Sequence, residues 1–112
     1  MPRIEPVDIG EAARRVGVSA AALRLYEKRG LLPTATRTAS GYRQYAEEDL
    51  QRARLVARAR RMGLSLAQIA QAIEGHCLHR LLRAHVEQLE REGRRLERVQ
   101  RHLRRWLNEM TA

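Results

Sequence analysis

The residues between Val18 and Tyr45 combine long cationic side chains with a pattern that places them on two neighbouring elements. Ser19 can cap a helix and Gly30 can end it, while the Ser-Gly pair at 40–41 indicates a turn in a short hairpin. The basic side chains that these two elements carry are Arg24, Lys28, Arg29, Arg37 and Arg43. Such groups neutralise phosphates, and a helix followed by a basic hairpin is how winged helix-turn-helix domains bind DNA.

The flanking sequence predicts the helices that position this segment. Asp8, three residues before Glu11, forms the pattern of a capping box at the start of a helix that ends near Val16. Gly17 permits a tight turn into the next helix, so the pair predicts a helix-turn-helix. The residues up to Val7 are expected to form a loose lead-in.

Two further helices are predicted after the hairpin. The first should run from about 47 to 62, with acidic residues in its first turn that complement the helix dipole. Ala46 precedes it, so this helix should lack a side-chain cap. The second should run from about 66 to 73, because Ser65 and Gln68 have the spacing of a capping box.

Several stretches agree in order and spacing with one known family. These are VSAAALRLYEKRGLL, TRTASGYRQYAEEDL and LVARARRMGLSLAQIAQAI. Together they resemble the opening of MerR-family transcriptional regulators, over roughly Ile9 to Ile73 and with a long final helix. The resemblance implies that the helix headed by Ser19 meets the major groove, where Arg24 would read bases, because the rest of its head is alanine. The wing residues and Arg60 would contact the phosphate backbone, which sets register without reading sequence. The residues implied to contact DNA are Ser19, Arg24, Tyr26, Lys28, Arg37, Tyr42, Arg43 and Arg60.

The last third of the chain predicts one long amphipathic helix, from about Leu78 to Met110. Apolar residues recur along it at coiled-coil spacing, with His85 and Glu92 as polar exceptions. Such a helix is too long to bury its apolar side on a small domain, so we expect a second chain to cover it. In the family the two long helices pair antiparallel. The residues predicted to mediate dimerisation are Leu82, Leu89, Leu96, Leu103 and Trp106.

Charge and composition limit the function classes. The formal net charge is +9, of which +6 falls on residues 1–63, where the DNA-binding pattern lies. No apolar run reaches membrane-spanning length and no signal-peptide pattern is present, and a single cysteine fits the reducing cytoplasm. Acidic residues and histidines are scattered without a nucleophile–base arrangement, so the chain is not expected to be an enzyme.

Cys77 is the one residue that suggests a sensor. Metal-sensing members of the family place a cysteine near the start of the long helix, with further ligands in a later loop. This chain has no second cysteine, and it ends about where that loop would begin. We therefore expect no metal and no cofactor, and Cys77 is expected to be a small packing residue. A metal sensor and a thiol-stress sensor remain the alternatives.

Together these patterns predict a mostly α fold. A MerR-type winged helix-turn-helix domain is expected at 8–75, and a dimerisation helix that forms an antiparallel coiled coil at 76–112. The expected function is that of a cytoplasmic bacterial regulator, a homodimer that distorts double-stranded promoter DNA for RNA polymerase, without an extended effector-binding domain. An architectural or recombination-accessory DNA-binding protein is the alternative from another class, as is a dimeric module whose basic coiled coil meets a protein partner.

Overall fold

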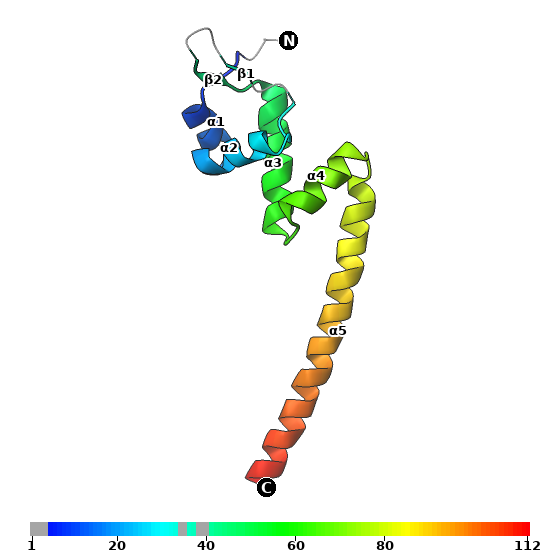
Figure 1. The fold of residues 1–112 in the computed structure, drawn as a ribbon. Helices are drawn as coiled ribbons and strands as arrows, with labels where there is room; N and C mark the ends of the chain where they lie inside the picture. Colours follow the sequence, from blue (N-terminus) through cyan, green and yellow to red (C-terminus); the bar gives the residue numbers. More distant parts are fainter. Residues whose placement is uncertain (1–4, 34–35, 38–40) are drawn as a thin grey trace. The chain divides into compact units, whose positions relative to one another are not determined.

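The chain is mostly helical and divides into two compact units, Met1–His76 and Cys77–Ala112. The computed structural model describes residues 5–33, 36–37 and 41–112, with the backbone alone at 36–37. In these ranges the first unit holds four helices and a two-stranded sheet, and the second is one long helix (Figure 1). Ser40, predicted to begin the hairpin turn, lies outside the described residues. Along the described part of the chain, no helix combines the length and the apolar character needed to cross a membrane.

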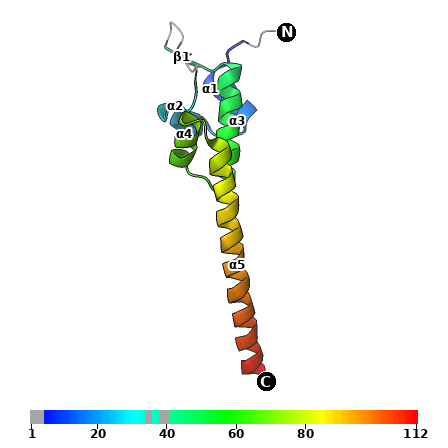
Figure 2. The same ribbon diagram turned by 90° about the vertical axis from the view of Figure 1, so that its right-hand side faces the viewer.

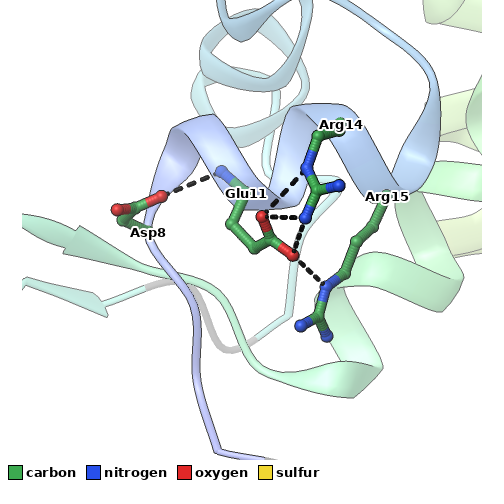
Figure 3. Close-up of polar contacts among 4 residues, drawn as sticks. All are labelled: Asp8, Glu11, Arg14 and Arg15. Atoms are coloured by element: carbon green, nitrogen blue, oxygen red, sulfur yellow. Dashed lines mark hydrogen bonds and ion pairs between the residues drawn. The ribbon is translucent and has the colours of Figure 1, made fainter.

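Helix α1 (Ile9–Val16) begins and ends at the predicted residues. Asp8 Oδ1 accepts a hydrogen bond from the Glu11 backbone N–H at 2.8 Å, which is the expected N-cap (Figure 3). The second bond of the predicted capping box, from the Asp8 backbone N–H to the Glu11 carboxylate, is absent from the contacts of Glu11. Its carboxylate turns instead to Arg14 and Arg15, at 2.5 and 2.8 Å, because ion pairs with both guanidinium groups outcompete one bond to a backbone N–H (Figure 3).

Helix α2 (Ala20–Lys28) follows after a turn of three residues. Gly17 has φ 82°, a left-handed conformation that glycine adopts without the steric cost of a Cβ, and its N–H caps α1. Ser19 Oγ then accepts from the Ala22 N–H at 3.0 Å and starts α2. The apolar sides of the two helices pack on each other and on α3 (Glu47–Arg61). Figures 1 and 2 show the ribbons of these three helices from two directions.

The wing is a short antiparallel hairpin. Strands β1 (Thr36–Arg37) and β2 (Arg43–Gln44) pair with Thr36 opposite Gln44. The prediction that the residues up to Val7 form a loose segment is wrong for Val7 itself. Val7 and Tyr45 form two backbone hydrogen bonds with each other, at 2.9 and 2.8 Å. This bridge fastens the start of the domain to the end of the wing, and residue pairs so distant in sequence leave no local pattern.

Helices α3 and α4 (Leu66–Glu74) carry most of the remaining core. Ala46 offers no side-chain cap to α3, as predicted. Asp49 Oδ2 nevertheless accepts a hydrogen bond from the Ala46 backbone N–H at 2.9 Å, which is the bond that the third helical residue makes in a capping box. Ser65 and Gln68 form the complete predicted capping box of α4. The largest fully buried side chains of the described chain are Tyr45, Leu23, Leu31, Leu50, Leu64, Ile69, Val56 and Asp49.

Helix α5 (Leu78–Thr111) is 34 residues long and ends one residue beyond the prediction. None of its residues is buried in the chain. Its exposed large apolar side chains are Leu82, Val86, Leu89, Leu96, Val99, Leu103, Trp106, Leu107 and Met110. Most of them repeat at intervals of three and four, so they share one side of the helix.

Candidate DNA-binding surface

An open hollow of about 700 Å³ lies between α2 and the wing. Four residues predicted from the sequence to contact DNA line it: Arg24, Lys28, Tyr42 and Arg43. The other described lining residues are Ile9, Glu27, Leu32 and Gly41. The fold therefore brings together cationic groups that are up to 19 positions apart in the sequence (Arg24 to Arg43), on a surface open to a large ligand.

The predicted residues of α2 divide between this surface and the core. Arg24 and Lys28 are exposed and four residues apart, so their side chains leave the helix on one side. Ser19 is exposed and caps the helix with its hydroxyl. Tyr26 is only 6 % exposed and packs in the core, which agrees with its inward position in the helical pattern and limits its reach towards a ligand.

The two tyrosines at the wing have opposite surroundings. Tyr42 is 71 % exposed beside the hollow, whereas Tyr45 is 1 % exposed and belongs to the core. The aromatic ring available to a ligand at the wing is thus that of Tyr42. Tyr45 anchors the wing, with its backbone paired to Val7 and its ring buried.

Glu27 connects α2 to the wing through both of its carboxylate oxygens. Arg43 forms an ion pair with Oε1, and the Tyr45 hydroxyl donates to Oε2 at 3.1 Å. Burial, followed by the negative charge of Glu27 and this hydrogen bond, raises the pKa of Tyr45 to about 12. The hydroxyl therefore stays protonated as a donor at neutral pH, which keeps this contact intact.

Glu27 was not predicted as part of the surface. The available signal was its position as an acid between Tyr26 and Lys28, inside a stretch that is otherwise basic. An acid in such a place requires a partner, because a carboxylate is costly to desolvate alone. A second signal was the spacing of Arg43 and Tyr45, since residues two apart on a strand face the same side.

The remaining predicted cations are not among the described lining residues of the hollow. Arg60 is exposed, and its Nη1 donates to the Leu64 carbonyl at 2.9 Å, which ties α3 to the segment between α3 and α4. Arg37 lies on β1, and the position of its side chain falls outside the described part of the structure. Arg14 and Arg15 were not predicted to bind DNA, and Glu11 already neutralises part of their charge.

Cys77 precedes α5 as a half-buried free thiol. Its neighbour His79 contacts Arg83, with Nε2 and Nη2 3.1 Å apart. Across residues 5–33, 36–37 and 41–112, no group of three or more His, Cys, Asp or Glu side chains is arranged to hold a metal ion. The packing and sensor interpretations of Cys77 both remain predictions.

Known proteins with similar sequences and structures point to one kind of molecule. Residues 7–76 match the family described as "MerR HTH family regulatory protein". A protein of Haemophilus influenzae named "Probable heavy metal-dependent transcriptional regulator" is 48% identical over 67 residues, which are 60% of this chain and 52% of that protein. The nodulation protein NolA of Bradyrhizobium elkanii is 38% identical over 104 residues, covering 92% of this chain and 48% of NolA.

A solved structure extends the likeness to the fold. HiNmlR, described as a MerR family regulator lacking the sensor domain and bound to promoter DNA, superimposes with a TM-score of 0.61 and 27% identity. The match covers 88% of this chain and 79% of HiNmlR. By contrast, the chain spans about half the length of the two curated relatives.

A helix-turn-helix, a basic wing and a matching set of regulators define a DNA-binding transcriptional regulator. More specifically, the chain belongs to the MerR family, because the family match covers most of its length. The resemblance and the mostly α winged fold predicted from the sequence are both confirmed. The family is described as one of regulatory proteins, and the Haemophilus influenzae protein and HiNmlR are both named as regulators, so the protein is a regulator and not an enzyme.

Proposed function

We propose that this protein is a homodimeric, sequence-specific transcriptional regulator of the cytoplasm that binds and distorts pseudo-palindromic promoter DNA. The observation that carries the proposal is the hollow beside α2, where Arg24, Lys28 and Arg43 converge in a member of a DNA-binding family. In this proposal residues 8–75 bind DNA and residues 76–112 form the dimer.

Within the hollow we assign different roles to α2 and the wing. Arg24 reads base edges in the major groove, since a guanidinium forms two hydrogen bonds with guanine. Lys28, Tyr42 and Arg43 contact the sugar-phosphate backbone. Four further residues support these contacts with the sugar-phosphate backbone of the DNA: Ser19, Tyr26, Arg37 and Arg60. Tyr26, with its ring in the core, contributes by holding α2 in place.

Helix α5 supports dimerisation because its apolar side lacks cover within its own chain. Leu82, Leu89, Leu96 and Leu103 are all exposed and follow one another at intervals of seven, and Trp106 continues the row. Exposed apolar rows of this length are uncommon on monomers and typical of coiled-coil partners. We propose that two α5 helices pair antiparallel through this row.

The proposed mechanism is deformation of the promoter. A regulator that bends and untwists DNA changes the relative position of two promoter elements that RNA polymerase must contact together. The promoter-DNA complex of HiNmlR supports DNA as the ligand of this fold. The cost of deformation is supplied by binding energy from the two basic surfaces of a dimer.

Selection from a pool of random duplexes tests the proposal directly. We expect the wild-type protein to enrich a two-fold symmetric sequence, and a bending assay with that sequence to show a defined bend. Equal retention of all sequences with strong bending would favour the architectural alternative. Failure to retain duplex DNA at low salt would contradict both.

A further inference from the structure

Glu27 is an unexpected group on a surface for a polyanion. It is the one acid among the described lining residues of the hollow, and its side chain is 14 % exposed. A carboxylate there repels DNA phosphates and weakens the attraction of Arg24 and Lys28. Its two contacts suggest what offsets this repulsion.

Both contacts of Glu27 come from the same side of the wing. Arg43 and Tyr45 are two residues apart, so both side chains turn towards α2, and each takes one carboxylate oxygen. Tyr45 is itself fixed by burial and by its backbone pairing to Val7. The carboxylate therefore joins a fixed point of the core to an arginine at the edge of the hollow.

We propose that Glu27 is a positioning residue for DNA binding, which holds Arg43 in the orientation in which it meets a phosphate. The proposal rests on the proposed function. A guanidinium has five N–H donors in a planar fork, so one edge can pair with a carboxylate while another edge meets a phosphate. Preorganisation of this kind removes the entropy cost of ordering a long side chain on binding.

The sign of the effect separates positioning from simple electrostatics. Loss of one negative charge near the DNA should by itself tighten binding. If Glu27 positions Arg43, its neutralisation should instead weaken binding, because a phosphate contact is lost. That loss also reduces the number of counterions released, so affinity becomes less sensitive to salt.

The experiment compares Glu27→Gln, Arg43→Ala and the double variant on a duplex that the wild-type protein selects from a random pool. We expect Glu27→Gln to weaken binding about tenfold, as expected for a charged hydrogen bond. The slope of log affinity against log salt should fall by about one, as for Arg43→Ala. The double variant should lose no more than Arg43→Ala, since both changes remove the same contact.

Glu48→Gln is the matched control. Glu48 is exposed on α3 in the same unit and is absent from the lining of the hollow, so this variant removes an equal charge elsewhere. It should bind as tightly as the wild type or slightly more tightly, with an unchanged salt slope. Circular dichroism establishes that each variant is folded. If Glu27→Gln does not fold, Glu27→Asp replaces it: the charge is kept, so simple electrostatics predicts unchanged binding, whereas loss of the contact to Arg43 should weaken binding.

Tighter or equal binding by folded Glu27→Gln, with an unchanged salt slope, would overturn the positioning role and leave DNA binding itself intact. Failure of the wild type to select any duplex would contradict the proposed function instead. The two failures are therefore distinguishable in one set of measurements.

Discussion

Arg24 and Lys28 lie one helical turn apart in the same hollow, yet we expect their substitution to have different effects. Arg24→Ala should lower the ratio of specific to non-specific affinity about tenfold or more, because an arginine that reads guanine contributes ~1–3 kcal/mol of discrimination. Lys28→Ala should weaken all duplexes about equally, because a phosphate contact carries no sequence information. Competition between selected and scrambled duplexes measures both, and an unchanged ratio for Arg24→Ala would remove its base-reading role.

Tyr45 links the stability of the wing to pH. Tyr45→Phe should lower the free energy of unfolding by about 1 kcal/mol, since it removes the hydrogen bond to Glu27. The pKa of Tyr45 is raised from 10.0 to about 12 in the folded chain. Its contribution is therefore complete below pH 10 and is lost as the pH rises towards 12.

Urea unfolding at neutral pH and near pH 11 tests this linkage. Wild-type protein should lose more stability over that range than Tyr45→Phe does. Equal losses in the two proteins would show that the phenol of Tyr45 ionises at its ordinary pKa in the folded state.

At the scale of elements, the helices could be predicted because their signals are local. Asp8, Ser19 and Ser65 mark helix starts through side-chain caps that reach only three residues ahead, and the apolar periodicity fixes the buried sides. The contacts that complete the DNA-binding surface are not local. The Val7–Tyr45 bridge and the Glu27–Arg43 ion pair join distant residues, and the local sequence indicates at most that Glu27 needs a partner, without specifying which residue it is.

The basic residues of the DNA-binding surface could be predicted from the sequence, whereas its tyrosines were predicted less well. Arg24, Lys28 and Arg43 were found because basic residues repeat across a helix and a hairpin, and the structure places them around one hollow. Tyr26 and Tyr42 were both predicted to contact DNA, but only Tyr42 is exposed beside the hollow, whereas Tyr26 is buried. Burial separates the two rings, and it depends on how α2 and the wing pack on the core.

Helix α5 contains one residue that weakens it. Gly93 lies in its interior, and beyond the adjoining backbone of the helix itself a Cβ added there would meet nothing within 4 Å. Gly93→Ala should therefore stabilise the helix by about 0.5–1 kcal/mol, seen as a higher melting temperature by circular dichroism. A lower melting temperature would mean that another chain approaches the helix closely at Gly93.

For the whole molecule, the decisive question is whether α5 holds two chains together. Leu89→Asp should convert dimers to monomers, because it places a charge in the middle of the apolar row. Sedimentation gives the mass, and duplex binding should weaken strongly in parallel. Ala84→Asp adds the same charge at an exposed position outside this row and should leave the dimer intact. Persistent dimers of Leu89→Asp would place the interface elsewhere.

The absence of any buried residue in α5 has a consequence for the response of a promoter to the amount of this protein. In the proposed homodimer, the helix acquires its apolar packing only from a second chain. Well below the dissociation constant, the amount of dimer follows the square of the monomer concentration, so a doubling of synthesis would raise the DNA-binding form about fourfold. Promoter output would then rise more steeply than the amount of the protein, because dimerisation precedes DNA binding.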